Sequence, residues 1–180
     1  SLWHKRSETD GSSTWRTLIG HATANIHHLI INDPTRNLGI WDGSFRDFGV
    51  APANDNQWHH YTVTYDSGSS ATLYVDGVYQ SKIFTTLDVA LNPIGTIGNW
   101  NSGNYWAGPI DQVKIYNYIR TPAQIAWDYN QGAPLVNYKL DEGAGTVAYN
   151  WNKVASAYNA TLYNSTPRTT SGRINKALSF

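Results

Sequence analysis

The chain has 180 residues, a length that suits a single domain. Its 13 basic residues balance 13 acidic residues, which excludes a net field that would attract it to nucleic acid or to an anionic membrane, and no apolar run reaches the length of a membrane span. Cysteine is absent, which excludes disulfides, and few charged residues (14%) beside many aromatic residues (13%) are typical of an extracellular all-β domain. Position 1 is serine, so we expect a processed product or a piece of a longer chain.

Predicted strands follow one another from the N-terminus. Stretches rich in β-branched and aromatic residues predict strands at 2–6, 15–21, 27–31 and 38–41. Residues 58 to 66, "WHHYTVTYD", alternate with a two-residue period, which predicts the next strand. Asp76 and Gly77 join two alternating segments, and because both residue types accept positive φ, they predict a hairpin turn. Further strands are predicted at 95–98, 111–116, 135–140, 160–163 and 177–180.

One segment, residues 121 to 132, predicts a helix instead. In "TPAQIAWDYNQG", Thr121 is the expected N-cap, Pro122 the first helical residue, Gln124 the partner in a capping box and Gly132 the stop signal. Many strands, frequent turns and one short helix near 121–131 predict an all-β fold, a two-sheet antiparallel β-sandwich.

Two long stretches carry a family resemblance. They are "NQWHHYTVTYDSGSSATLYVDGVYQSK", residues 56 to 82, and "GTIGNWNSGNYWAGPIDQVKIYNYIRTPAQIAWDYNQG", residues 95 to 132. The order of a Trp-His-His strand, a Tyr-Val-Asp-Gly hairpin, an Ile-Asp-x-Val-x-Ile-Tyr-Asn strand and a Thr-Pro helix closely resembles laminin-G-like domains of the concanavalin A-like lectin/glucanase superfamily. The resemblance covers most of residues 1–132 and implies a jelly-roll sandwich.

Residues 134 to 180 resemble the start of such a domain, which in family order should precede residue 1. We therefore expect residues 1–132 to be the body of one laminin-G-like sandwich, 1–180, and residues 133–180 to supply its family N-terminal strands. These strands complete the sandwich either in cis, as a circular permutation, or from a neighbouring copy or repeat. A sandwich that lacks a strand has an unpaired edge, which is a template for strand addition.

Motifs for catalysis are not found. The only glutamates are Glu8 and Glu142, and no carboxylate spacing suggests the pair that a glycosidase needs. The sequence has no cysteine nucleophile, no Gly-x-Ser-x-Gly, no P-loop and no His-Glu-x-x-His. His59 and His60 are neighbours in a predicted strand, so they point to opposite faces and cannot share a ligand; the same holds for His27 and His28. We predict a protein that is not an enzyme.

Carbohydrate binding is what the resemblance implies, because sugar faces stack on exposed aromatic rings while amides and carboxylates bind the hydroxyls. Trp100 and Trp151 lie in Asn-rich loops, with Asn104 in the loop of Trp100, and Trp41 lies beside Asp42 at a strand end. These five residues are the predicted sugar-binding set, and partial burial of each tryptophan is the alternative. Four other tryptophans are predicted to pack in the fold, namely Trp3, Trp58, Trp106 and Trp127.

A structural Ca²⁺ is a second expectation from the resemblance, since related sandwiches hold the ion with carboxylate and amide oxygens. Asp111 matches an aspartate of the family, and Asn150 stands at a position where the family commonly has a second aspartate. Asp141 and Asn152 are further candidate ligands that could lie nearby. The alternative is that these residues are hydrogen-bonded loop anchors. Asn-x-Thr motifs make two further positions candidates for glycosylation, Asn159 and Asn164.

Two functions from different classes follow. The first is a non-catalytic carbohydrate-binding or adhesion module of a secreted or cell-surface protein, whose partner is a polysaccharide or cell-surface glycan. The second is a structural unit that assembles with copies of itself, as a tandem array or filament, through strand exchange and without a small ligand.

Overall fold

The computed structural model describes residues 1–6, 15–32, 35–88, 91–100, 104–106, 108–131, 136–142, 144–151, 159–163, 168–169 and 177–178. Their contacts divide the chain into two units, Ser1–Tyr129 and Asn130–Phe180, and each is described by itself. Among the described residues, no helix is long and apolar enough to cross a membrane.

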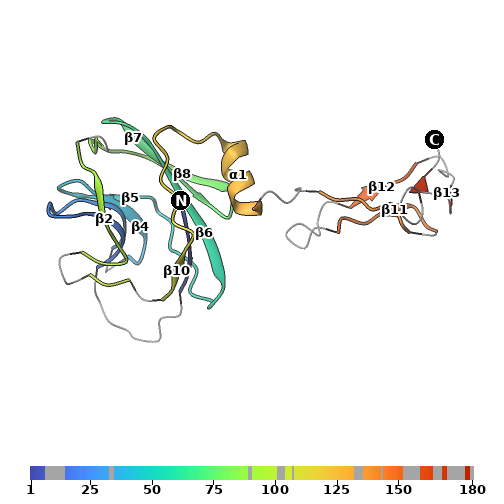
Figure 1. Ribbon diagram of the computed structural model, residues 1–180, viewed down its shortest axis with the longest axis horizontal. Coiled ribbons are helices and arrows are strands. Elements are labelled where there is room, and N and C mark those ends of the chain that lie inside the picture. Colours follow the sequence, from blue (N-terminus) through green and yellow to red (C-terminus); the bar gives the residue numbers. More distant parts are fainter. Residues whose placement is uncertain are drawn as a thin grey trace. The chain divides into compact units, whose positions relative to one another are not determined.

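The first unit is a sandwich of two five-stranded antiparallel sheets, as predicted (Figure 1). The β6 sheet has the order β10-β1-β6-β7-β8, with strands β1 (Leu2–Lys5), β6 (Trp58–Asp66), β7 (Ser70–Val75), β8 (Val78–Phe84) and β10 (Ile110–Asp111). The β3 sheet has the order β5-β4-β3-β2-β9, with strands β2 (Arg16–His21), β3 (His27–Ile31), β4 (Leu38–Trp41), β5 (Phe45–Asp47) and β9 (Ile94–Ile97). Of these strands, β5 was not predicted.

The hydrophobic core lies between the facing sheets. Period-two alternation turns Leu2, Tyr61 and Leu73 of the β6 sheet inward, where they join Leu29 and Leu38 of the β3 sheet. Each of these side chains is at most 4% exposed. Burial of a side chain of this size stabilises the fold by about 1.5–3 kcal/mol, so the core is the main source of stability of this unit.

His4 of β1 is part of this core. Its ring stacks on Tyr61, with 4.2 Å between the centroids, and meets Trp106 edge-on at 4.6 Å. Burial, with smaller effects of His59 and Arg6, lowers the pKa of His4 to about 3, so the ring is neutral at pH 7. Trp106 is buried, which confirms its predicted packing role.

Two other tryptophans do not pack as predicted. Trp58 is 43% exposed and Trp127 is 63% exposed. Trp58 shares the outer side of β6 with alternate residues of the strand, whereas the core-facing residues are those in between. Trp127 is two residues from the fully buried Ile125, which is about 200° around a helix, so it lies on the opposite face.

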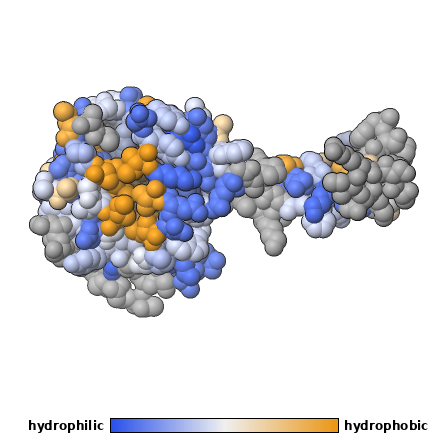
Figure 2. Space-filling view, viewed as in Figure 1, coloured by the Kyte–Doolittle hydropathy of each residue, from blue (hydrophilic) through white to orange (hydrophobic). Residues whose placement is uncertain are grey.

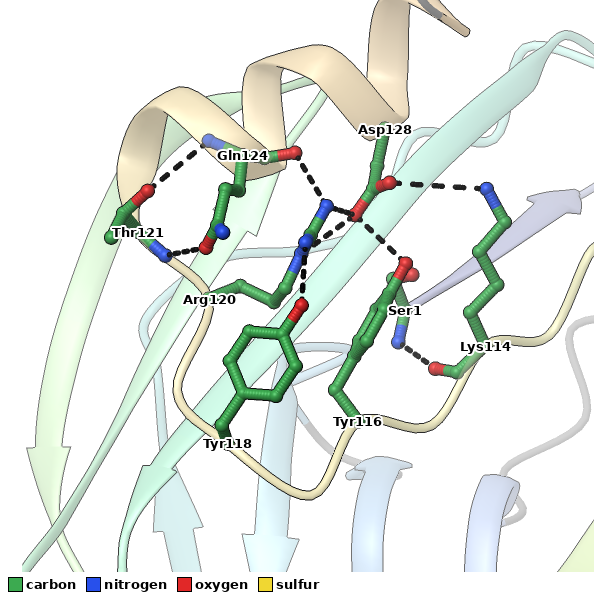
Figure 3. Close-up of polar contacts among 8 residues, drawn as sticks. All are labelled: Ser1, Lys114, Tyr116, Tyr118, Arg120, Thr121, Gln124 and Asp128. Atoms are coloured by element: carbon green, nitrogen blue, oxygen red, sulfur yellow. Dashed lines mark hydrogen bonds and ion pairs between the residues drawn. The ribbon is translucent and has the colours of Figure 1, made fainter.

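The hairpin turn and the helix have the predicted local structure. Asp76 and Gly77 have φ values of 51° and 78° and join β7 to β8. Helix α1 (Pro122–Asn130) begins after Thr121, whose N–H donates to Gln124 Oε1 at 2.9 Å while Gln124 N–H donates to Thr121 Oγ1 at 3.3 Å (Figure 3). The predicted capping box is therefore confirmed.

Helix α1 packs on the outer face of the β6 sheet. The Tyr129 ring stacks on Trp3, with 5.6 Å between the centroids. A Cβ added at Gly77 would lie 3.2 Å from the Tyr129 ring, so the glycine of the hairpin turn allows the helix to approach closely.

The strand predicted at 111–116 ends much earlier. Gln112 has a φ of 47°, which turns the backbone out of the β10 ladder. Pairing resumes once, where Ser1 and Lys114 exchange backbone hydrogen bonds of 2.7 and 2.8 Å. Beyond that point residues 115–120 form no strand.

Asp128 of α1 holds the segment that follows β10 (Figure 3). Its carboxylate accepts hydrogen bonds from Tyr116 Oη at 3.1 Å and Arg120 Nη2 at 2.8 Å, and Lys114 Nζ lies 3.9 Å away. The Arg120 guanidinium also stacks over the Tyr116 ring, 4.4 Å from its centroid. These contacts fix the segment against the helix, which explains why it does not continue the sheet.

The described residues of the second unit form four two-residue strands, β11 (Val147–Ala148), β12 (Ala160–Thr161), β13 (Arg168–Thr169) and β14 (Ala177–Leu178). They form two separate pairs, β11-β12 and β13-β14. The strands predicted at 160–163 and 177–180 are thus present in part. The described residues of the strand predicted at 135–140 form only a bridge between Tyr138 and Asn150. Completion of a sandwich by residues 133–180, in cis or from a neighbouring copy, stays a prediction.

Candidate functional site

The outer side of the β3 sheet carries a group of aromatic rings, which we call the aromatic face: Trp15, His27, Trp41, Phe45 and Trp100. Trp41 of β4 is paired with His27 of β3 on one side and with Phe45 of β5 on the other. Directly opposed residues of antiparallel strands point to the same side of a sheet. The three side chains therefore share one face, while Leu38 and Ile40 of β4 point into the core.

A β-bulge turns His27 to this side. In β3 the core residues Leu29 and Ile31 alternate regularly, and His27 would follow them inward if the strand were regular. The register with both neighbouring strands shifts between His27 and Ile30, however, which inserts an extra residue. His27 thereby faces outward beside Gly20, whereas the next residue, His28, lines the interior.

The tryptophans and Phe45 contact each other edge to face. The Trp15 ring lies 5.4 Å from both Trp41 and Phe45, with interplanar angles of 79° and 75°. A Cβ added at Gly39 would come within 2.3 Å of the Phe45 ring. Phe45 therefore covers β4 closely only because position 39 has no side chain.

His27 forms a rigid, uncharged part of the aromatic face. Its Nδ1 lies 2.9 Å from Thr17 Oγ1 and its Nε2 lies 3.0 Å from Asn25 Oδ1. Burial, and to a lesser degree His28, lowers the pKa of His27 to about 4, so the imidazole is neutral at pH 7. With Nε2–H donating to Asn25 and Nδ1 accepting from the Thr17 hydroxyl, both ring nitrogens have partners.

Trp100 lies against His27, with 5.2 Å between the ring centroids. Its Nε1–H donates to the Ala24 carbonyl at 3.0 Å, and the side chain is half-buried. Asn104 follows nearby, because its carbonyl accepts the N–H of Thr17 at 2.8 Å. Three residues of the predicted sugar-binding set, Trp41, Trp100 and Asn104, thus lie on or beside one face.

Asp42, also in the predicted set, uses its carboxylate internally. It accepts hydrogen bonds from Arg46 Nε at 3.0 Å, Thr85 Oγ1 at 2.8 Å and Thr86 N–H at 3.1 Å, and its side chain is 2% exposed. Burial opposes its ionisation, but these hydrogen bonds outweigh burial and lower the pKa of Asp42. The geometry fits an anchor between the end of β4 and residues 85–86, and the role of Asp42 in sugar binding stays a prediction.

Trp151, the fifth residue of the set, belongs to the second unit and is 57% exposed. The Lys139 ammonium lies over its ring, 4.1 Å from the centroid. The Trp151 N–H donates to the Asn137 carbonyl at 2.9 Å. Its role in sugar binding stays a prediction.

The predicted calcium ligands make local hydrogen bonds. Asp111 Oδ1 accepts the N–H of Gln112 at 2.7 Å, and Asn150 Oδ1 accepts that of Asn137 at 2.9 Å. Asp111 is in the first unit, Asp141 and Asn150 are in the second, and Asn152 lies outside the described residues. The described part of the chain contains no group of three or more His, Cys, Asp or Glu that could hold a metal ion. These contacts fit the alternative of loop anchors, and Ca²⁺ stays a prediction.

The two predicted glycosylation positions differ in what the structure describes. Asn159 is exposed, and its Oδ1 accepts the N–H of Asn150 at 2.9 Å. Asn164 lies outside the described residues.

Sequence reasoning missed Trp15, His27 and Phe45. The signal for Phe45 was present, because Trp41 and Phe45 flank the short turn segment "DGS" and thus form a cross-strand pair. His27 was set aside as one of two neighbours on opposite faces. No local pattern reveals the bulge that turns it outward.

Comparisons with known proteins agree with this architecture. Residues 1–126 match a laminin-G family model described as "Concanavalin A-like lectin/glucanases superfamily". No match was found among curated protein sequences. Among solved structures, the chain is similar to a protein from Bacteroides ovatus named "putative carbohydrate binding protein", with a TM-score of 0.54, 18% identity, and coverage of 91% of this chain and 53% of that one. The chain thus spans about half the length of that protein, and at this identity the likeness shows the fold.

Proposed function

Because this chain belongs to the concanavalin A-like lectin/glucanases superfamily, we propose that it is a non-catalytic carbohydrate-binding module whose sugar site is the aromatic face. The observation that carries the proposal is the gathering of aromatic rings on one side of the β3 sheet, where Trp15 contacts Trp41 and Phe45, and Trp100 contacts His27, the strand partner of Trp41. Such a surface offers rings to the C–H faces of sugars, and its rim offers amides such as that of Asn104 to the hydroxyls.

The partner that we propose is a polysaccharide or cell-surface glycan outside the cell, and adhesion is the expected role. The charges next to the aromatic face are paired, since Arg46 binds Asp42 at 3.0 Å, and His27 is neutral. This pairing favours an uncharged glycan over an acidic one, because the Arg46 guanidinium is already bound to a carboxylate and His27 carries no charge.

The main arrangement with a catalytic appearance is a histidine between two carboxylates. His59 Nδ1 lies 2.7 Å from Asp76 Oδ2, and His59 Nε2 lies 3.2 Å from Asp55 Oδ2. Both ring nitrogens are therefore occupied, and neither can accept a proton from a substrate. Asp76 also accepts the N–H of His60 at 2.8 Å. The cluster fastens residues 55–59 to the hairpin turn, which supports a non-catalytic role for the protein.

Affinity electrophoresis and a glycan array test this function. We expect the chain to bind a neutral polysaccharide, and Trp41→Ala or Trp100→Ala to weaken binding by at least about tenfold, or 1.4 kcal/mol. Trp127→Ala is the matched control, because Trp127 is exposed on α1 away from the aromatic face and should leave binding unchanged. Near-ultraviolet circular dichroism verifies that each variant is folded. Equal losses in all three variants, or no binding by the unmodified chain, would contradict the proposal.

A further inference from the structure

A groove of about 820 Å³ opens into the side of the first unit, between its two sheets. One wall is β6, with Val63 and Tyr65, and the opposite wall is the β3 sheet, with Leu29 and Ile94. Residues 113–120 form the third side. Most of these apolar side chains belong to the core or pack against it, so the floor of the groove is the hydrophobic core itself.

The sides of the groove expose apolar residues and unpaired backbone. Strand β9 is the edge of the β3 sheet and pairs only with β2 among the described strands. On the other side, Ile115 is 63% and Ile119 57% exposed, in the segment that has left the β10 ladder. Figure 2 shows a hydrophobic patch on this unit, on the face where Figure 1 places the N-terminus. An apolar opening between two sheet edges is a template for an added strand.

His28 indicates the chemistry of an occupant. It lines the groove and is buried, and its Nε2–H donates to the Asn92 carbonyl at 2.8 Å. Burial lowers the pKa of His28, so the ring is neutral and Nδ1 is an acceptor. Within the described residues Nδ1 has no hydrogen-bond partner. A peptide supplies N–H donors to such an acceptor while its side chains cover the apolar walls, whereas a hydrocarbon ligand leaves the nitrogen unsatisfied.

The same chain contains a segment with the pattern of such a strand. From Val136 to Asp141, apolar Val136, Tyr138 and Leu140 alternate with polar residues. In the second unit its described pairing consists of the bridge between Tyr138 and Asn150 and of two backbone hydrogen bonds of Asn137, one to Asn150 Oδ1 and one from the Trp151 N–H. Leu140 has a φ of 60°, a conformation that leucine rarely adopts and that an extended strand would relieve.

We propose that the groove is a strand-docking site and that its occupant is residues 136–142 of a second copy of this chain. Every residue that lines the groove lies within residues 1–120, and the matching segment lies in the other unit, so each copy offers both a groove and a strand. The added strand contributes backbone hydrogen bonds at the sheet edge and places alternate side chains on the exposed core. Docking between copies produces a closed dimer when it is reciprocal and an open array when it is not.

Directed disulfide formation tests this pairing, because the chain has no cysteine. An Ile115→Cys variant is mixed with a Tyr138→Cys variant under mild oxidation. We expect covalent heterodimers in at least about tenfold higher yield than in a mixture of Val78→Cys with Tyr138→Cys. Val78 is the matched control, since it is 62% exposed but lies on β8, at the edge of the β6 sheet opposite β10. Equal yields in the two mixtures would overturn the proposal.

Sedimentation velocity gives an independent readout. We expect the unmodified chain to self-associate with rising concentration, and Ile115→Asp to raise the dissociation constant by at least about tenfold, while Val78→Asp leaves it unchanged. Both positions are exposed, so neither substitution should prevent folding. A chain that is monomeric at all concentrations overturns the proposal. So does an Ile115→Cys/Tyr138→Cys double variant that closes only within one chain, because the occupant is then the chain's own strand.

Discussion

Gly39 and His27 shape the aromatic face at the scale of single residues. Gly39 lets the Phe45 ring lie over β4, and the bonds of His27 to Thr17 and Asn25 fix its ring beside Trp100. The position of the Phe45 ring is fixed by packing, and that of the His27 ring by hydrogen bonds within the protein. The face is therefore organised before any sugar arrives, which limits the side-chain entropy lost on binding.

Gly39→Ala tests this packing. A Cβ at position 39 meets the Phe45 ring at 2.3 Å and the Arg46 carbonyl oxygen at 2.5 Å, and backbone cannot move away as a side-chain tip does. We expect the free energy of unfolding to fall by about 1–3 kcal/mol, as for other overpacked sites, when measured by urea denaturation. Gln80→Ala, at an exposed strand position, should change it by less than about 0.5 kcal/mol. A stability unchanged by Gly39→Ala would show that Phe45 does not occupy this position.

At the scale of elements, helix α1 contacts both the hairpin turn of the β6 sheet and the segment that borders the groove. Its first turn is capped by Thr121 and Gln124, and its last residues cover the hairpin turn at Gly77. Between them, Asp128 binds Tyr116 and Arg120 and so holds the segment that borders the groove. The helix thus anchors the segment that forms one side of the groove.

Thr121→Ala tests the cap. Loss of the Thr121 hydroxyl leaves the N–H of Gln124 without its partner, so we expect the free energy of unfolding to fall by about 1 kcal/mol. Thr121→Ser keeps a hydroxyl at the same place and should retain most of this stability. Thermal unfolding followed by circular dichroism measures both variants. Equal melting temperatures for Thr121→Ala and the unmodified chain would be inconsistent with a stabilising capping box.

Buried histidines make the stability of the whole first unit depend on pH. Burial is the main cause that lowers the pKa of His4 to about 3 and of His27 and His60 to about 4, and it also lowers the pKa of His28. Their unfolded pKa is about 6.5. Between about pH 6.5 and 4 the unfolded chain therefore binds protons that the folded unit excludes, and stability falls as pH falls.

The slope can be measured by urea denaturation at a series of pH values. We expect the free energy of unfolding to decrease steadily from pH 6.5 to pH 4. His59 acts in the opposite sense, because hydrogen bonds to Asp76 and Asp55 outweigh burial and raise its pKa. The stability that His59 contributes is therefore fully present below about pH 6.5 and is lost as pH rises through the pKa of His59 in the folded state. His59→Gln should therefore reduce the fall in the free energy of unfolding above pH 6.5, and should leave its decrease between pH 6.5 and pH 4 unchanged. A stability that is constant from pH 6.5 to 4 would contradict the burial of neutral histidines.

The sequence by itself determined the local elements. Period-two alternation, the Asp76–Gly77 turn and the Thr121–Gln124 capping box predicted strands, hairpin and helix, because each signal lies within a few neighbouring residues. The resemblance over residues 1–132 likewise predicted the sandwich, which the family match over residues 1–126 confirms.

Only the tertiary structure decided what depends on residues far apart in the chain. The bulge in β3 that turns His27 outward, the positive φ of Gln112 that ends β10, and the bonds of Asp42 to Thr85 and Thr86 each arise from pairing or packing with distant segments. A propensity pattern contains no information on such partners. The aromatic face and the open groove therefore depend on how the sheets fold together, whereas most of the strands that form them could be predicted from patterns of neighbouring residues.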